Sequence, residues 1–519
     1  MTALVAFVVV VGVIAAGLAD FRWLRVAQRE HYLPGAVTTF GLRWWVRLGP
    51  NRLLALAAVL GTVLSPLSPF TALVGLIAIA VGPFRFPLRG RAPGPVVWTK
   101  RLRTVALVTG GLQVVVLVAG IAVGLTVPAV SIAALLSPLV VDAALLVLLP
   151  FEEHKAEGFV RQAGSRLAQV APLVVAITGS YGKTTTKAYT AHLIAGSKTV
   201  VPTPASFNNR AGLSRAINEH LIAGTEVFIA EMGTYGPREI AEMCEWCRPR
   251  IAAITAIGPV HLERFGNEEA IVRAKSEIFD HAEIAVLNVD DSRLAKLADE
   301  LELRGVRVLR ASGVDTSADV SAIISGTLES DGRLVVTVAG EQIADVPAPD
   351  AVASNVAVAV GLAVAAEVPV GAIGPSLRTL PTVANRRTTA KLSTGATAID
   401  DTFNSNPAGC RAALATLRRL SRPGGKRIVV TPGMVELGDV QAKENEAFAA
   451  EAVAQATHVM FVGFTNRPAL LRGANAGASA DRAEILVADT HDRAVDWVRA
   501  HTGDGDVVLY ENQLPDHYP

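Results

Sequence analysis

The sequence predicts a helical membrane region followed by two α/β domains. Of the 519 residues, 51% are hydrophobic and only 18% are charged, which is too apolar for an ordinary soluble protein. The three longest uncharged runs all lie within residues 1–150. After them, short apolar runs alternate with helix-like segments, which is the pattern of a mostly parallel sheet covered by helices.

The long uncharged runs span residues 1–19, 53–84 and 104–141. A helix needs about 20 apolar residues to cross a bilayer, because unpaired backbone groups cannot lie in hydrocarbon. We therefore expect about five helices in this region. They lie near 3–19, on either side of a break at 65–69, and near 104–126 and 129–149. The pair around the break is either two spans or one re-entrant hairpin.

Basic residues predict the orientation of these helices. They follow the first apolar run, whereas a cleaved signal peptide carries its charge before that run. The two turns that carry charge are basic, and the positive-inside rule places both in the cytoplasm. The N-terminus is then outside and residue 151 onward is inside, so we expect a multi-pass protein of the cytoplasmic membrane. The basic residues are Arg22, Arg25, Arg29, Arg43, Arg47, Arg52, Arg85, Arg89, Arg91, Lys100, Arg101 and Arg103.

Charge is divided unevenly along the chain. Residues 1–150 carry 12 basic and 3 acidic side chains, and the remaining residues carry 36 and 44. Because the positive charge lies between hydrophobic runs, we expect no nucleic-acid partner. Three cysteines are too few for a disulfide scaffold. Cys244 and Cys247 lack the second pair that a four-cysteine zinc site needs, and we expect them to be structural.

The soluble part is predicted to contain two domains, because its strand pattern stops and then restarts at Arg427. The expected boundary near 380–390 gives a membrane region of 1–150, a central domain of 151–385 and a C-terminal domain of 386–519. The expected strands are 173–177, 227–230, 251–257, 284–289, 307–310, 334–338, 427–430, 458–462, 484–487 and 506–510.

A glycine-rich turn follows the first expected strand and opens a helix. It reads Thr178-Gly179-Ser180-Tyr181-Gly182-Lys183-Thr184-Thr185-Thr186. The backbone N–H groups of such a turn close on phosphate oxygens, helped by the positive end of the helix. We expect Lys183 to reach the β- and γ-phosphates and Thr184 to bind Mg²⁺. Ile177 stands where the usual eight-residue pattern begins with glycine.

Three further polar residues follow in the central domain. Glu231 ends an expected strand, where a carboxylate beside a phosphate loop suits Mg²⁺ or its bound water. His261 precedes Leu-Glu-Arg-Phe-Gly, and Lys275 lies in Ala-Lys-Ser-Glu. Taken alone, a histidine or a lysine at such a place is more often structural, so the functional interpretation depends on the whole set.

The order and the residues of these segments resemble the Mur ligase superfamily, and most closely its MurF members. The resemblance covers roughly residues 170–519, and it implies a P-loop central domain with a mostly parallel sheet and a C-terminal Rossmann-like α/β domain. The matching segments are 178–186, 206–212, 231–233, 257–266, 274–275, 287–291, Arg386, 400–407 and 433–438.

The resemblance also implies a role for single residues, with ATP and two Mg²⁺ ions as cofactors. Thr184 and Glu231 would hold one Mg²⁺ and His261 the second, while Lys275 matches a carbamylated lysine that helps to organise the metal site. The expected catalytic residues are Lys183, Glu231, His261 and Lys275. The expected nucleotide contacts are Gly179, Ser180, Tyr181, Gly182, Lys183, Thr184, Thr185, Asn288 at the adenine, and Arg386 and Asp401 from the C-terminal domain.

The implied reaction is ATP-dependent amide synthesis for cell-envelope peptidoglycan precursors, at the cytoplasmic face of the membrane. A carboxylate attacks the γ-phosphate, and the amine of an amino acid or short peptide then displaces phosphate from the acyl phosphate. MurF enzymes begin with a soluble domain that binds the UDP end of the substrate, and here membrane helices stand in its place. The acceptor is therefore either UDP-linked or lipid-linked.

Two alternatives stay open. One is a poly-γ-glutamate-type or folylpolyglutamate-type ligase of the same superfamily, although the C-terminal motifs favour MurF. The other is a membrane-bound nucleotide sensor or scaffold without ligase activity, which would not need both metal sites.

Two departures from the family pattern bear on the substrate and leave ATP use untouched. Thr431-Pro432-Gly433-Met434 replaces the usual Gly-Asp-Met, and Phe403 replaces a common tyrosine.

Overall fold

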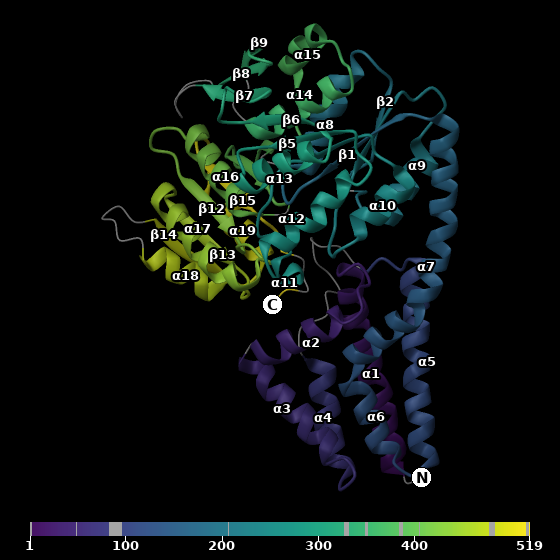
Figure 1. The fold of residues 1–519 in the computed structure, drawn as a ribbon. Coiled ribbons are helices and arrows are strands. Elements are labelled where there is room, and N and C mark those ends of the chain that lie inside the picture. Colours follow the sequence, from purple (N-terminus) through teal and green to yellow (C-terminus); the bar gives the residue numbers. More distant parts are fainter. Residues whose placement is uncertain are drawn as a thin grey trace. The chain divides into compact units, whose positions relative to one another are not determined.

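The computed structural model contains two compact units, coloured along the sequence in Figure 1. The helical unit comprises Met1–Lys155 and Leu514–Pro519, and the α/β unit comprises Ala156–Gln513. The structure describes residues 3–47, 49–82, 96–205, 207–325, 332–347, 351–383, 388–403, 405–476, 483–514 and 518.

Seven helices account for most of the described helical unit. Two of them, α1 and α5, are long and apolar enough to cross a membrane, and the bent pair of α6 and α7 makes a third if it is counted as one span. The helices are α1 (Ala3–Arg29), α2 (Ala36–Arg47), α3 (Gly49–Val63), α4 (Pro69–Val81), α5 (Lys100–Ala122), α6 (Thr126–Leu135) and α7 (Ser137–Val170), which continues beyond residue 155.

These helices differ from the five that the sequence predicts. The expected helix near 129–149 is broken, and α6 and α7 meet at 75°, because Pro138 has no N–H to continue the preceding helix and fits only a first turn. The two helices around the break at 65–69 have 15 and 13 residues, and at 1.5 Å per residue each is shorter than a bilayer core of about 30 Å. The described residues contain two candidate spans, or three if α6 and α7 count as one, so the pair around the break fits the re-entrant alternative better than two separate spans.

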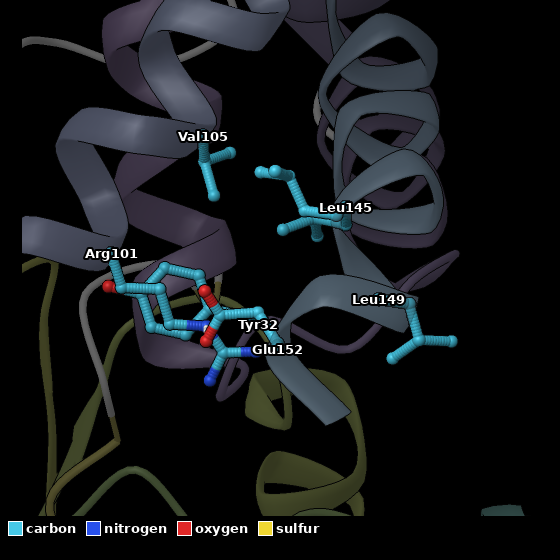
Figure 2. A pocket seen from close by; sticks show the side chains of 7 residues that line it. Tyr32, Arg101, Val105, Leu145, Leu149 and Glu152 are labelled. Atoms are coloured by element: carbon cyan, nitrogen blue, oxygen red, sulfur yellow. Dashed lines mark ion pairs between the residues drawn. The ribbon is translucent and has the colours of Figure 1, made fainter. Parts of the chain in front are cut away.

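Polar side chains inside the helical unit pair with one another. Gln113 and Ser137 donate hydrogen bonds of 2.8 and 2.6 Å to Asp20, so partly buried side chains of three helices satisfy each other. Figure 2 shows a shallow pocket in the same unit, where Arg101 lies over the ring of Tyr32 and 3.5 Å from the carboxylate of Glu152.

The first sheet of the α/β unit has nine described strands in the order β2-β3-β1-β4-β5-β6-β7-β8-β9. Neighbours are parallel from β2 to β7, and β7, β8 and β9 are antiparallel. The strands are β1 (Leu173–Thr178), β2 (Val200–Pro202), β3 (Val227–Glu231), β4 (Ile251–Ile254), β5 (Ile284–Asn288), β6 (Arg307–Ser312), β7 (Val320–Ser325), β8 (Arg333–Val338) and β9 (Glu341–Pro347).

Helices cover both faces of this sheet, so its central strands read as continuous apolar runs. Val175 and Ile177 of β1 pack on one side with α8 and α14, and the alternate residues Val174 and Ala176 pack on the other with α9, α10, α12 and α13. The helices are α8 (Lys183–Ala195), α9 (Arg210–His220), α10 (Glu239–Cys247), α11 (Leu262–Phe265), α12 (Glu268–Ser276), α13 (Ser292–Leu303), α14 (Ala353–Ala365) and α15 (Val370–Ser376).

The second sheet has six described strands in the order β10-β11-β15-β12-β13-β14, and only the edge pair β10–β11 is antiparallel. Helices α16, α17 and α18 pack on one face and α19 on the other. The strands are β10 (Thr388–Lys391), β11 (Thr397–Asp401), β12 (Arg427–Thr431), β13 (His458–Val462), β14 (Glu484–Ala488) and β15 (Val507–Glu511), and the helices are α16 (Pro407–Leu420), α17 (Gln441–Gln455), α18 (Arg467–Ala476) and α19 (His491–His501).

Candidate functional site

The glycine-rich turn forms the link between β1 and α8, and its shape requires glycine at two positions. Gly179 and Gly182 have φ of +152° and +79°, which other residues rarely adopt. A Cβ on Gly179 would lie 2.0 Å from Oγ1 of Thr255, and a Cβ on Gly182 would lie 2.3 Å from Oδ1 of Asn355. The turn is therefore a tight cradle that any side chain at either position would fill.

The segment after β4 holds the cradle from one side. The Ser180 N–H donates to the carbonyl of Ala256 at 2.7 Å. The Ser180 hydroxyl lies 3.1 Å from both the N and the carbonyl O of Gly258. On the other side Lys183 folds back and donates to the Gly179 carbonyl at 2.6 Å. Thr184 and Thr185 stand in the first turn of α8, whose N-terminal N–H groups suit phosphate oxygens.

Glu231 ends β3, directly beside β1, and its carboxylate is almost completely buried. Oε1 accepts hydrogen bonds of 3.2 Å from Thr184 Oγ1 and from Asn208 Nδ2. Oε2 lies 2.9 Å from Nζ of Lys187. Thr184 and Glu231 thus meet as the sequence predicts, and a lysine that the sequence analysis did not single out joins them.

The spacing of these two oxygen donors fits magnesium. Neighbouring ligands of an octahedral Mg²⁺, each 2.0–2.1 Å from the ion, are about 3 Å apart, and Thr184 Oγ1 and Glu231 Oε1 are 3.2 Å apart. Across the described residues no group of three or more His, Cys, Asp or Glu gathers closely enough to hold a metal. A site with one carboxylate suits Mg²⁺ with phosphate and water ligands better than zinc or calcium.

Lys187 is the main site residue that sequence reasoning missed. It follows Thr184 by three residues on α8 and so lies on the same helix face, which is the signal that was available. Its side chain is 6% exposed, and Nζ also donates to the carbonyl of Ala205 at 2.5 Å. The ion pair with Glu231 compensates a carboxylate that would otherwise be buried with neutral donors alone.

Lys275 lies on α12 and is 3% exposed. Within the described part of the chain, no carboxylate forms an ion pair with it. Burial holds the pKa of this amine well below its usual value, and the charge of Lys183 lowers that pKa further. Burial therefore favours the uncharged form of this amine, which lies close enough to the phosphate loop for the charge of Lys183 to act on it.

His261 takes part in a separate contact. It precedes α11 with φ of +60°, and its Nδ1 lies 2.5 Å from Oε2 of Glu436, a residue that follows β12. The ring of Tyr235 packs edge-on against the imidazole, with 4.7 Å between centroids. Among the described residues, no hydrogen bond or ion pair joins His261 to Glu231, so the structure places these two expected metal ligands in different contact groups.

The expected nucleotide contacts lie at several strand ends. Asn288 ends β5 and donates to the carbonyl of Thr255 at 3.0 Å, which links it to the segment that braces the cradle. The ring of Tyr181 packs against Gly258, and burial raises the pKa of its hydroxyl. Asp401 ends β11, opposite Glu511 of β15. Arg386 lies outside the described residues.

Glu511 is a second buried carboxylate that sequence reasoning missed, because the expected strand stops one residue before it. Ser405 Oγ donates to Oε1 at 2.5 Å, and Cys410 Sγ lies 3.1 Å from the same oxygen. Thr431 Oγ1 lies 3.4 Å from Oε2. Burial raises the pKa of Glu511 to about 7, and the nearby Asp401 adds to this shift while the hydrogen bonds oppose it.

Comparisons with known proteins agree with this geometry. The Mur ligase middle domain matches residues 177–363, and the Mur ligase glutamate ligase domain matches residues 386–510. A UDP-N-acetylmuramoyl-tripeptide–D-alanyl-D-alanine ligase of Mycobacterium leprae is 32% identical, over 69% of this chain and 76% of the relative. Its counterpart in Mycobacterium tuberculosis is 31% identical, over 75% and 82%.

Solved structures show the same fold. MurF from Acinetobacter baumannii superposes with a TM-score of 0.59 at 24% identity, over 69% of this chain and 77% of the other. The MurF ligase of Thermotoga maritima, solved in complex with ADP, gives 0.58 at 24% identity, over 69% and 80%. The chain therefore belongs to the Mur ligase family, in which it is a MurF-like ATP-dependent amide ligase of peptidoglycan precursor synthesis.

Proposed function

We propose that this chain joins the amine of a D-alanyl-D-alanine-type dipeptide to the carboxylate of a muramoyl-tripeptide precursor, with hydrolysis of ATP to ADP and phosphate. The relatives described above are named for this reaction. The observation that supports it most is the Thr184–Glu231 pair beside the glycine-rich cradle at the start of α8. Transfer of a γ-phosphate requires a turn that binds the phosphates and, beside it, oxygen ligands for a cation.

The reaction has two steps. The acceptor carboxylate attacks the γ-phosphorus and the bond to the ADP oxygen breaks, which leaves an acyl phosphate. The amine then attacks the acyl carbon and loses a proton, and the tetrahedral intermediate expels phosphate. The N–H groups of the cradle hold the phosphates in line, and Lys183 neutralises the charge that gathers on the transferring group.

Further residues support these steps. Thr184 and Glu231 would hold one Mg²⁺ and His261 a second, and these ions would neutralise charge on the phosphates. Asn288 would contact adenine, and Asp401, at the end of β11, and Arg386 would contact the nucleotide from the C-terminal part of the chain. These roles are supported by the resemblance to the family and by the strand-end positions of the described residues.

Lys275 is proposed to react with CO₂. A bond forms between Nζ and the carbon of CO₂, and the amine loses a proton, so a buried neutral group becomes an N-carboxylate anion that can face a cation. Its burial and the lowered pKa of the amine favour this reaction, because only the neutral amine is a nucleophile.

The proposal keeps the three-part division of the chain at residues 150 and 385. The two apolar helices α1 and α5 favour a catalytic part held at the cytoplasmic face of a membrane. That placement makes a lipid-linked acceptor the second candidate substrate. The parallel core of the second sheet, with helices on both faces, supports the Rossmann-like assignment of the C-terminal domain.

ADP release by the full-length protein in mild detergent tests the proposal. One reaction contains UDP-N-acetylmuramoyl-tripeptide with D-Ala-D-Ala, and the other contains a membrane lipid extract with an amino-acid mixture. Stimulation by the first supports the proposed substrates. Stimulation by the second alone indicates that the same ligase reaction uses a lipid-linked acceptor. Thr184→Val, which keeps the shape of the side chain and removes its hydroxyl, should abolish the response. If neither mixture stimulates ADP release, the proposed substrates are wrong.

A further inference from the structure

We propose that Glu436 is a positioning residue for His261, and that it makes the second metal site dependent on the seating of the C-terminal sheet beside the first sheet. This inference rests on the proposed function, because it takes His261 to be a metal ligand. It assigns a role to the Gly433–Gly438 segment, which the reaction described above does not use.

The contact between the two residues involves both side chain and backbone. Oε2 of Glu436 lies 2.5 Å from Nδ1 of His261, and the Glu436 carbonyl accepts a hydrogen bond of 3.1 Å from the N–H of Leu262. The two side chains are 30% and 22% exposed, so the pair is partly shielded from water and still open on one side.

The choice of ring nitrogen gives this contact a chemical consequence. A carboxylate beside Nδ1 accepts the proton that this nitrogen carries, and the lone pair of the imidazole is then on Nε2. Histidines that bind metals commonly donate their other N–H to a carboxylate, which fixes both the tautomer and the ring orientation. Glu436 thus leaves Nε2 of His261 available to a cation, while Tyr235 packs against the ring.

Backbone conformation supports a positional role for both residues. His261 and Glu436 have φ of +60° and +64°, a left-handed conformation that is unfavourable for residues with side chains and is concentrated at functional sites. Two such residues in direct contact show that the surrounding chain fixes the geometry of the pair.

Two asparagines beside the C-terminal sheet, Asn445 of α17 and Asn466 just before α18, hold the start of the segment that carries Glu436. Asn445 accepts a hydrogen bond of 2.8 Å from the Met434 N–H and donates one of 2.9 Å to its carbonyl, and Asn466 donates to the same carbonyl at 2.9 Å. Both asparagines are buried. These bonds fix Met434, two residues before Glu436, so the position of Glu436 beside His261 depends on the C-terminal elements that hold this segment.

The test compares Glu436→Gln and Glu436→Ala with wild type in the full-length protein. Asp439→Asn is the matched control, because Asp439 is an exposed acid three residues further along the same segment. The readouts are Mn²⁺ binding by electron paramagnetic resonance, in the presence of a non-hydrolysable ATP analogue, and the separate values of kcat and KM for ATP.

We expect Glu436→Ala to weaken the binding of one of two Mn²⁺ ions by about 10- to 100-fold. Glu436→Gln keeps an acceptor oxygen and should give a smaller loss in the same direction. Both variants should lower kcat and leave KM for ATP within about twofold. A loss of folded protein would instead reduce the binding of both Mn²⁺ ions in the same proportion, so the selective loss of one ion distinguishes the two causes. The Gln variant has the shape of the native residue, so it decides the question if the Ala variant does not fold.

Wild-type Mn²⁺ binding and kcat in both variants would overturn the inference. His261→Ala separates this outcome from a failure of the proposed function. If His261→Ala loses the ion and the Glu436 variants keep it, only the role of Glu436 is wrong. If His261→Ala also binds two ions normally, the assignment of His261 as a metal ligand is wrong, and the role of Glu436 is wrong with it.

Discussion

Replacing Lys187 with methionine should destabilise the α/β unit far more than an ordinary lysine substitution. Its ammonium lies 2.9 Å from Glu231, and the two side chains are 6% and 1% exposed. At this distance the attraction is about 6 kcal/mol for an effective dielectric constant of about 20, and the cost of desolvating both charges cancels part of it. Removing the lysine alone leaves a buried carboxylate with hydroxyl and amide donors, so we expect a loss of about 3–5 kcal/mol.

The three cysteines provide a selective assay for this loss. Cys244, Cys247 and Cys410 are all buried in the α/β unit, and they are the only cysteines in the chain. Labelling them with a thiol reagent during heating therefore reports unfolding of this unit and not of the helical unit. At roughly 2–4 °C per kcal/mol for a domain of 150–250 residues, the midpoint should fall by at least about 6 °C.

Lys296→Met is the matched control, because Lys296 is 79% exposed and only 3.9 Å from the exposed Glu300. Such a surface pair contributes about 0.5 kcal/mol or less. The double variant Lys187→Met/Glu231→Leu should recover much of the lost stability and remain inactive, since it removes the unpaired charge as well. A Lys187→Met midpoint equal to that of Lys296→Met would refute the reasoning.

Three further predictions concern the amine, the cradle and the second buried acid. Lys275→Ala should abolish ligation and leave ATP binding nearly intact, and only wild type should show a carbamate signal by NMR after exposure to ¹³CO₂; unchanged turnover would contradict carbamylation. Gly182→Ala should weaken ATP binding at least about tenfold by calorimetry, because its φ is positive and a Cβ meets Asn355. Gly224→Ala, with φ of +84° and open space around it, should change the affinity less than about twofold, and equal effects would exclude the cradle as the cause. Glu511 has its pKa raised from 4.5 to about 7 in the folded state by burial. The folded chain therefore holds a proton that the unfolded chain has released, and wild type should lose about 3 kcal/mol of stability relative to Glu511→Gln as the pH rises from below 4.5 through 7; a constant difference in thiol-labelling midpoints at pH 4 and pH 8 would rule this out.

The sequence predicts best the strands in the parallel cores of the two sheets, although it also predicts β8, which lies in antiparallel pairs, and β14, which lies at an edge. Residues 173–177 and 459–462 are uninterrupted apolar runs because both faces of their sheets are covered, and the structure contains β1 and β13 at these places. The strands that were missed lie toward edges or in antiparallel pairs. In β9 only Val346 is buried, and polar residues interrupt the sequence, so no apolar run marks the strand.

The same distinction applies to the candidate site. The cradle is local, since its glycines, Lys183 and Thr184 lie within six residues, and the strand–turn–helix order predicts where it forms. The partners of Glu231 and His261 are not local. Lys187 becomes a site residue only through its contact with Glu231, which is 44 positions away in the sequence, and Glu436 only through its contact with His261, which is 175 positions away. A single sequence offers no rule that pairs residues at such separations.

The sequence separation of contacting residues also determines the order in which parts of the site can form during synthesis. The cradle leaves the ribosome early in the α/β unit, but the segment that braces it, Thr255–Gly258, follows more than 70 residues later. At about 5–20 residues per second, Glu231 emerges roughly 2–9 s after Lys187, and Glu436 roughly 9–35 s after His261. A chain interrupted between His261 and Glu436 already contains both partners of the lysine–glutamate pair, and its histidine is still without the carboxylate. The ion pair beside the cradle can therefore form before the catalytic centre is complete.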